Sequence, residues 1–328
     1  MLKRTVNSAT VDLTITPIDP MLIKSGQATV SGVDMAFVQT YRSGAQAEPF
    51  IPGSSLKGVV RSYAEKICRS LRQTPVPVCL PYVDVGQEQN GERGQASCGL
   101  RIKEILTRIN KDALPSSDVY RISCPACRMF GSQYFIGRLC TSDGYLTEAF
   151  KQSGRPVLEI RDGVAIDRLT GGPAGSAKYD LEVLTKAEFG TRIEIHNFER
   201  WQIGLLGLVL RDMEEGLLRI GMGKSRGLGR IEADVKHFEV TYFGKPQQQL
   251  IGLAKACTED ECAGYGLFEE KDPGENLPEP SRKGLRYSYD LTSSWKPAME
   301  SALDDFVSFV RDVAWPGDID SYAEGRRR

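Results

Sequence analysis

The order of strand-like and helix-like patterns is the feature of this sequence that most constrains its fold. Residues 11–16 alternate apolar and polar side chains, as a half-buried strand does. A helical pattern follows at 56–71, and a second, nearly continuously apolar one lies at 201–213, before a closing alternating segment at 230–242. Shorter strand-like segments between the two helices are 157–160, 181–184 and 191–195. The order strand, helix, strand, strand, helix, strand predicts an α+β fold of the ferredoxin-like class with long insertions.

The first helical pattern is preceded by the segment IPGSSLKGVVR at 51–61. Its Pro-Gly pair predicts a turn, and either of the following serines can cap the helix. The first turn of such a helix offers free backbone N–H groups beside Lys57, which suits phosphate oxygens. An ordinary capped helix that binds no ligand is the alternative. The turn and cap residues are Pro52, Gly53, Ser54 and Ser55.

Charged residues are unevenly distributed, although the net charge is only −1. Five basic side chains lie between residues 54 and 72, and four more lie between 217 and 230 without any acid. Residues 258–280 reverse this balance, with eight carboxylates and a single lysine. A basic surface suited to nucleic acid can therefore coexist with a near-neutral total. Solvated helix faces and a solvated acidic loop are the alternative.

The chain of 328 residues is long enough for two domains, or for one domain with large insertions. We expect a principal domain over 1–244, with an insertion at about 73–140 and a glycine-rich protruding finger at about 161–180. An acidic, proline-rich linker is expected at 245–284, and a C-terminal extension at 285–328. The extension carries apolar side chains at helical spacing and is expected to form an amphipathic helix over 296–314.

Hydropathy excludes a membrane-spanning class of protein. No apolar run approaches the roughly 20 residues that a membrane span needs. The first residues, MLKRTV, lack the apolar core of a signal peptide. We therefore expect a cytoplasmic protein with no membrane partner.

The glycine-rich segment GMGKSRGLG at 221–229 ends like a phosphate-binding P-loop. Leu218, however, stands where that motif needs its first glycine, and a helix precedes the loop while a strand follows it. These departures disfavour a nucleotide triphosphatase. What remains is a backbone that can approach a phosphodiester chain closely, surrounded by positive charge. The basic side chains are Lys224, Arg226 and Arg230.

Cys124 and Cys127 form a Cys-Pro-Ala-Cys pair, the spacing that presents two thiolates to one metal ion. Cys79 and Cys98 are the best candidates for the other half of a structural zinc site. Because two separate cysteines are a weaker signal than a second tight pair, free thiols or a redox pair are the alternatives. Spare candidates are Cys68 and Cys140.

Catalytic constellations such as Ser-His-Asp, Cys-His or paired carboxylates do not stand out in the sequence. The best single candidate is Asp34, the one acid between Asp19 and Glu48. A carboxylate beside a positively charged groove can orient a metal ion or take a proton from a ribose 2′-hydroxyl. A turn residue without a catalytic role is the alternative interpretation of Asp34.

Four motifs together resemble, in order and spacing, the RAMP proteins of type III CRISPR systems. The resemblance is closest to their backbone subunits, in the subgroup with a cysteine insertion (type III-D/E-like), and covers about residues 10–243. Met222 departs from the pattern, because relatives often have glycine there. The four motifs are IPGSSLKGVVR at 51–61, CPACRMFG at 124–131, RDGVAIDRLT at 161–170 and LLRIGMGKSRGLGR at 217–230.

The resemblance implies a modified RNA-recognition fold that stacks along a CRISPR guide RNA with other RAMP and effector-complex subunits. The finger would act as a thumb that splays a nucleotide of the guide–target duplex. Asp34 falls in the slot of the aspartate that cuts target RNA, with Mg²⁺ or another divalent metal. The residues this assigns to RNA binding are Ser54, Ser55, Lys57, Arg61, Arg161, Arg168, Gly221, Gly223, Lys224, Ser225, Arg226 and Arg230.

Two other functions remain open at this point. Some relatives are spacers that do not cleave, so a purely structural RNA-binding subunit is the first alternative. A stand-alone RNA-processing nuclease is the second, and the absence of a histidine near the basic loops disfavours it.

Overall fold

The computed structural model describes residues 3–26, 33–42, 46–83, 96–271 and 274–312, together with residues 315, 322 and 325. Its strands are β1 (Asn7–Pro17), β2 (Gln39–Thr40), β3 (Glu48–Pro49), β4 (Gly131–Ser132), β5 (Phe135–Ile136), β6 (Leu139–Thr141), β7 (Tyr145–Leu146), β8 (Val157–Ile166), β9 (Pro173–Lys186), β10 (Phe189–His196), β11 (Ile231–Phe243), β12 (Ser281–Lys283) and β13 (Arg286–Asp290). Its helices are α1 (Gly53–Leu71), α2 (Cys98–Ile109), α3 (Ser116–Arg121), α4 (Pro125–Phe130), α5 (Glu148–Ser153), α6 (Arg200–Glu214), η3 (Lys224–Arg226), α7 (Leu253–Ala256), α8 (Glu259–Tyr265), η4 (Thr292–Ser294), α9 (Trp295–Glu300) and α10 (Leu303–Asp312).

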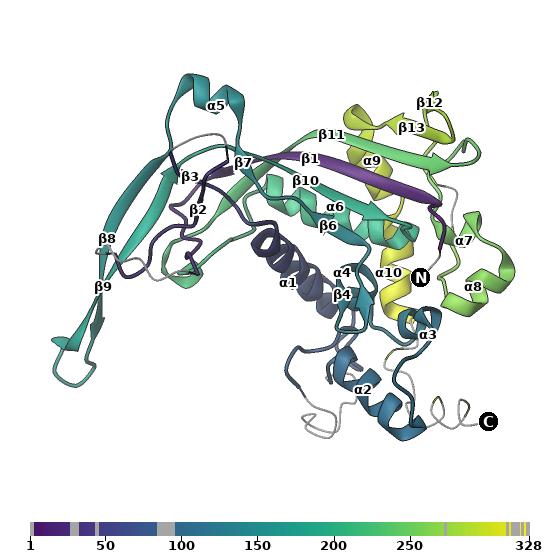
Figure 1. The fold of residues 1–328 in the computed structure, drawn as a ribbon, viewed down its shortest axis with the longest axis horizontal. Helices are drawn as coiled ribbons and strands as arrows, with labels where there is room; N and C mark the ends of the chain where they lie inside the picture. The colour runs from purple at the N-terminus through teal and green to yellow at the C-terminus, as the bar shows by residue number, and fades with distance from the viewer. Residues whose placement is uncertain are drawn as a thin grey trace.

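The main sheet is antiparallel and has the order β12-β13-β11-β1-β10-β6, with β7 also pairing with β10 (Figure 1). Its strands β1, β6, β10 and β11 and the helices α1 and α6 follow one another along the chain as strand, helix, strand, strand, helix, strand. The resulting strand order, with the first strand between the fourth and the third, is that of a ferredoxin-like sandwich. The structure therefore confirms the predicted α+β, ferredoxin-like fold.

Alternation along β1 decides which side chains enter the core. Ala9, Val11, Leu13 and Ile15 are buried against the helices, and the residues between them turn to the opposite face. That opposite face is polar and open. There Asp12 bonds Arg192 of β10 (Nε to Oδ1, 2.6 Å), and Thr10 stands between two glutamates of the neighbouring strands, Glu194 and Glu239.

The second strand of the sandwich differs from the sequence prediction. The sequence favours 157–160, but those residues belong to the hairpin of β8 and β9, and the place beside β10 is taken by β6. β6 has only the three residues Leu139–Thr141, with the single buried side chain Leu139. So short a strand shows no alternation in sequence, and it lies at the end of a stretch assigned to the insertion.

The hairpin of β8 and β9 projects from the body of the molecule, as the glycine-rich sequence predicts (Figure 1). Its strands pair Asp162 with Asp180 and Gly163 with Tyr179. Several of its apolar side chains are exposed, Leu169 near the tip among them. The base of the hairpin touches the body through β-bridges from Met21 to Leu184 and from Met35 to Leu181.

The chain after β11 returns to the body. In the segment 245–284, for which a linker is expected, Leu250 and Leu253 are fully buried. β13 then extends the sheet beside β11. Where the sequence predicts one helix over 296–314, the structure has α9 and α10, separated by Ser301 and Ala302. The Ser301 hydroxyl donates to the carbonyl oxygen of Ala298 (2.8 Å), a local bond that competes with the helical backbone pattern.

α1 and α6 cover the buried face of the sheet, and α10 packs against both helices (Figure 1). Trp201 of α6 is fully buried and stacks on Phe309 of α10, with ring centroids 4.2 Å apart. An aromatic pair of this kind contributes about 1 kcal/mol beyond the area that it buries. No helix within the described ranges is both long and apolar enough to cross a membrane.

Candidate functional site

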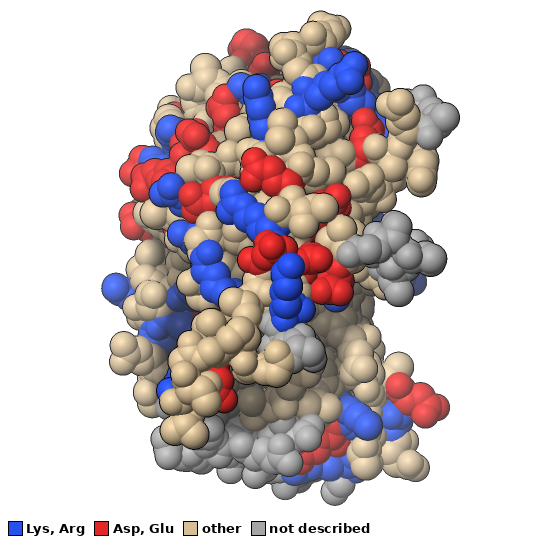
Figure 2. All heavy atoms as spheres, turned by 90° about the vertical axis from the view of Figure 1, so that its left-hand side faces the viewer, with Lys and Arg blue, Asp and Glu red and all other residues tan. Residues whose placement is uncertain are grey.

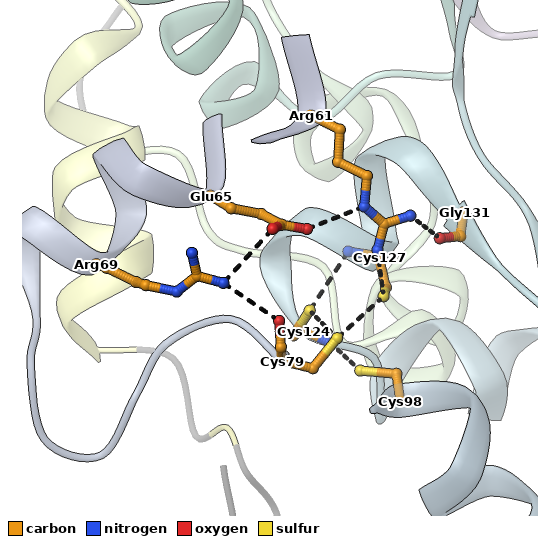
Figure 3. A network of polar contacts seen from close by, with 8 residues as sticks. All are labelled: Arg61, Glu65, Arg69, Cys79, Cys98, Cys124, Cys127 and Gly131. Atoms are coloured by element: carbon orange, nitrogen blue, oxygen red, sulfur yellow. Dashed lines mark hydrogen bonds and ion pairs between the residues drawn. The ribbon is translucent and has the colours of Figure 1, made fainter. Parts of the chain in front are cut away.

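Four cysteines from separate segments meet in one buried cluster (Figure 3). Cys79 follows α1 in sequence, Cys98 begins α2, Cys124 caps α4 and Cys127 lies within α4. Their sulfur atoms all lie within 4.8 Å of one another. In the part of the chain that the structure describes, no other group of three or more His, Cys, Asp or Glu side chains is so close.

The spacing of these sulfurs fits a tetrahedral metal site. Cys79 Sγ lies 3.6 Å from Cys127 Sγ and 3.7 Å from Cys124 Sγ. Four thiolates about 2.3 Å from a central zinc ion stand about 3.8 Å apart. Backbone N–H groups also point at sulfur, from Cys127 to Cys124 (3.4 Å) and from Cys124 to Cys98 (3.3 Å). The cluster can therefore bind a metal such as zinc.

The thiols of the cluster form hydrogen bonds with one another, and these bonds affect their acidity. Contacts from the thiols of Cys124 and Cys127 lower the pKa of Cys79, while burial raises the pKa of Cys124. A metal ion replaces such protons, because only thiolates coordinate it. The two spare candidates do not join the cluster: Cys68 is buried on α1 and Cys140 is exposed on β6.

The start of α1 differs from the predicted capped helix. The helix begins at Gly53 after Pro52, and neither serine caps it. The Gly53 N–H instead donates to the carboxylate of Asp143 (2.7 Å). Ser54 is exposed and Ser55 half-buried, but the first N–H already has a protein anion as its partner.

The glycine-rich loop after α6 packs closely on the chain near residue 22. Gly221 has a φ of +84°, and a side chain there would meet the carbonyl oxygen of Leu22 at 2.1 Å. The Met222 N–H donates to that same oxygen (2.8 Å). Glycine at 221 is thus required by the fold itself, whereas Met222, in the position where relatives often have glycine, has a half-exposed side chain.

Three segments meet beside this loop. Arg226 Nη1 donates to the hydroxyl of Tyr179 on the hairpin (2.5 Å). Burial lowers the pKa of Lys224, and the nearby charge of Lys66 on α1 lowers it further. The structure thus brings together the glycine-rich loop, α1 and the base of the hairpin, three of the segments that the sequence assigns to RNA binding. We call this region the loop–hairpin surface, and it consists of Lys66, Tyr179, Lys224 and Arg226. Lys57 is half-buried on α1, nine residues before Lys66 and so on the opposite side of the helix.

Other predicted RNA contacts are engaged within the protein or lie farther out. Arg230 pairs with Asp19 (3.3 Å), and Arg161 pairs with Glu159 within β8 (3.3 Å). Arg168 is exposed near the hairpin tip. Arg61 turns toward the cysteine cluster, which the sequence did not indicate. Its partners Glu65 and Arg69 were also missed, although all three follow one another at i, i+4 spacing on α1.

Asp34 is exposed and lies against the base of the hairpin. Its Oδ2 accepts a hydrogen bond from the backbone N–H of Asp180 (3.1 Å). A side-chain hydrogen bond with Asp162 raises the pKa of Asp180, and the charge of Asp34 adds to that rise. Within the described ranges, no group of three or more His, Cys, Asp or Glu side chains gathers around Asp34 to form a metal site.

The side of the molecule from which the hairpin projects carries both signs of charge (Figure 2). Lys and Arg side chains alternate there with Asp and Glu instead of forming one positive field. Contacts with a polyanion on this side therefore depend on local groups of cations. The loop–hairpin surface is such a group.

A sandwich of this strand order, with a protruding hairpin and a buried cluster of four cysteines, defines a ferredoxin-like protein with a candidate metal site. The chain belongs to the RAMP superfamily, whose family model matches residues 14–232, two thirds of its length. No curated protein matches the chain. The RAMP domain indicates a CRISPR-associated, RNA-binding subunit.

Proposed function

We propose that this chain is a guide-RNA-binding backbone subunit of a type III CRISPR effector complex. The observation that carries the proposal is the hydrogen bond from Arg226 to Tyr179, since it joins the glycine-rich loop to the base of the hairpin. Lys224 and Lys66 stand beside this junction. Cations on two segments, α1 and the glycine-rich loop, can contact successive phosphates, and such contacts position RNA without reading its sequence.

The RNA would pass along the loop–hairpin surface, not across the sheet. Many proteins with this type of sheet stack bases on its open face. Here the open face carries Asp12, Glu194 and Glu239, with Arg192 bound to Asp12. Carboxylates disfavour a polyanion on that face. Other RAMP and effector-complex subunits, along with target RNA, are the further partners that this function requires.

We extend the proposal to cleavage of complementary target RNA through Asp34. The side chain is exposed, and its bond to the Asp180 N–H holds it at the base of the hairpin, where a splayed nucleotide would lie. Mg²⁺ commonly uses one or two carboxylates and takes its remaining ligands from water and phosphate. A single carboxylate of this kind is compatible with Mg²⁺ or another divalent ion, which would supply Lewis-acid chemistry at the phosphate.

The cleavage proposal is tested with Asp34→Asn in the assembled complex. The asparagine oxygen can still accept the bond from Asp180, so the loop keeps its position while the charge is lost. We expect target binding within about twofold of wild type and loss of the cuts at this subunit's position. Asp304→Asn, which neutralises an exposed carboxylate on α10, is the control and should leave the cleavage ladder unchanged.

An unchanged ladder in Asp34→Asn would contradict the catalytic part and leave a non-catalytic RNA-binding subunit, the alternative function. A wild-type complex that contains no guide RNA would contradict the proposal that this subunit binds guide RNA. Sizing and sequencing of the RNA that copurifies with the protein tests this second point directly.

We also propose that the cysteine cluster holds a structural zinc ion. Four buried thiols with tetrahedral spacing and no open position leave no place for substrate. The ion would join α2 and α4 of the insertion to the segment that follows α1, and so fix the insertion to the sandwich.

A further inference from the structure

Arg61 of α1 is directed at the cysteine cluster and not at solvent. Its Nη2 donates to Cys127 Sγ (3.4 Å), its Nη1 to the carbonyl oxygen of Gly131 (3.0 Å) and its Nε to Glu65 Oε1 (2.9 Å), as Figure 3 shows. Only 28% of the side chain is exposed. The three nitrogens of the guanidinium are thus all occupied by protein, and the group is not presented to a phosphate.

Glu65 and Arg69 complete the same network. The Glu65 side chain is 8% exposed and accepts from both Arg61 and Arg69 (3.4 Å). Arg69 Nη2 also donates to the carbonyl oxygen of Cys79 (3.4 Å). One face of α1 therefore presents two positive charges and one negative charge to the cluster. Arg69 reaches the backbone of a candidate ligand, while Arg61 reaches a ligand sulfur.

The net negative charge of four thiolates that bind a divalent ion would be stabilised by a cation next to the sulfur atoms. Four thiolates around a divalent ion carry a net charge of about −2. The four cysteines are buried, and a buried charge without compensation is costly. A guanidinium in contact with one sulfur lowers that cost. Its hydrogen bond also orients the ligand, as outer-shell partners of metal sites do.

We propose that Arg61 is a positioning residue of the metal centre, which compensates the charge of the four thiolates and ties the ion to α1. The inference rests on the proposed zinc site. It assigns Arg61 a role different from the phosphate contact predicted from sequence. It also links the two candidate sites, because Arg61 and Lys66 of the loop–hairpin surface both belong to α1.

The test compares purified full-length wild type, Arg61→Gln, Arg61→Lys and the control Lys66→Gln. Zinc affinity is measured by competition with a chromophoric chelator. We expect Arg61→Gln to weaken zinc binding about 10- to 100-fold, because outer-shell substitutions commonly have this effect. Arg61→Lys keeps the charge and should restore much of the affinity. Lys66→Gln changes an exposed lysine of the same helix and should bind zinc as wild type does and bind RNA more weakly.

Cobalt(II) adds a readout that a general loss of packing would not produce. Thiolate-to-cobalt charge-transfer bands depend on the electron density at sulfur, and the Arg61 guanidinium lowers that density at Cys127. We expect these bands to shift in Arg61→Gln and to shift less in Arg61→Lys. If Arg61→Gln does not fold, Arg61→Lys is the variant to measure.

The outcomes distinguish the role of Arg61 from the zinc site on which that role rests. Wild-type zinc affinity in Arg61→Gln, with weakened RNA binding like that of Lys66→Gln, would overturn the role of Arg61 and leave the zinc site standing. A wild-type protein that binds neither zinc nor cobalt would overturn both. Weaker zinc binding in Arg61→Gln, rescued by lysine, supports the inference.

Discussion

Arg200 and Asp305 form an ion pair that is completely buried, with Nε 2.6 Å from Oδ2 and both side chains 0% exposed. Arg200 begins α6 of the sandwich and Asp305 lies on α10 of the C-terminal extension. Residue 305 lies beyond the region that the RAMP family model matches, which ends at 232. The extension is therefore joined to the family core through the interior of the protein and not only at its surface.

Asp305→Ala should strongly destabilise the protein. Removing the carboxylate leaves the Arg200 guanidinium buried without this partner, a change that typically costs about 3–5 kcal/mol. Asp304→Ala is the control, because Asp304 is exposed one residue earlier on the same helix, and we expect it to stay within about 0.5 kcal/mol of wild type. Urea unfolding measures both. Equal stabilities of the two variants would contradict a structural role for the pair.

Stability should depend on pH through Glu270. Burial raises the pKa of Glu270 from 4.5 to about 7, although the charge of Arg200 and the N–H of Gly252 act in the opposite direction. Because the folded state binds the proton more tightly, the stabilisation is fully present below about pH 4.5 and is lost as pH rises through about 7.

Glu270→Gln should remove this dependence. Between pH 5.5 and 8, the free energy of unfolding of wild type should fall by about 2 kcal/mol more than that of the variant, at about 1.4 kcal/mol per pKa unit. Unfolding in urea at both pH values provides the measurement. Glu269→Gln changes an exposed neighbour and should keep the wild-type dependence. Parallel pH profiles for wild type and Glu270→Gln would contradict the prediction.

Two glycines of α1 should respond in opposite ways to alanine. A side chain at Gly53 would meet the carbonyl oxygen of Thr141 on β6 at 2.7 Å, and since that atom belongs to the backbone, we expect a loss of about 1–3 kcal/mol. Gly58 is exposed with open space around it, so Gly58→Ala should gain about 0.5–1 kcal/mol from helix propensity. Chemical denaturation measures both. A neutral Gly53→Ala would show that the start of the helix can move away from β6.

Metal analysis of the purified protein should find about one zinc ion per chain. Cys124→Ser should lose the ion and lower the melting temperature. A chelator should lower the melting temperature of wild type but not that of the variant. Cys140→Ser is the control, because Cys140 is exposed on β6 outside the cluster, and should keep the ion. A wild-type protein purified without chelators and found free of metal would contradict the zinc site.

Lys224→Ala should weaken RNA binding by the same factor for different sequences, since the lysine is proposed to contact phosphate. The slope of log K against log salt concentration should fall in magnitude by about 0.7, the value expected when the protein neutralises one phosphate fewer on a single strand. Fluorescence anisotropy at several salt concentrations measures it. Lys236→Ala, on the open sheet face beside Asp234, should leave the slope unchanged. A weakening restricted to one RNA sequence would indicate base recognition instead.

Much of the fold follows from patterns within single segments. β1, α1 and β11 each bury one side of a regular element over eleven or more residues, and α6 is an apolar helix buried on nearly all sides; both patterns are visible without tertiary information. β6 and the pair of β12 and β13 are too short for any periodicity. Their pairing is decided by the neighbouring strands, as with Glu239 of β11 opposite Asp290 of β13.

The candidate sites also combine features visible within a short stretch of sequence with contacts between distant positions. The spacing of Cys124 and Cys127 indicates a metal ligand pair locally, and their partners were predicted from residue type alone. The contact of Arg61 with the Cys127 sulfur could not be predicted, because the sequence places Arg61 among basic residues and Cys127 lies 66 positions away. Likewise, the carboxylate at the start of α1 comes from Asp143, 90 positions from Gly53.

The open face of the sheet and the loop–hairpin surface present opposite charges to nucleic acid. A polyanion that approaches the open face meets Asp12, Glu194 and Glu239, and one that approaches the loop–hairpin surface meets lysine and arginine. Repulsion at the open face shortens the lifetime of misoriented complexes, whereas complexes formed at the loop–hairpin surface persist. The carboxylates of the sheet thus help to set the orientation of bound RNA without touching it, and their neutralisation would allow the protein to dock the wrong way round.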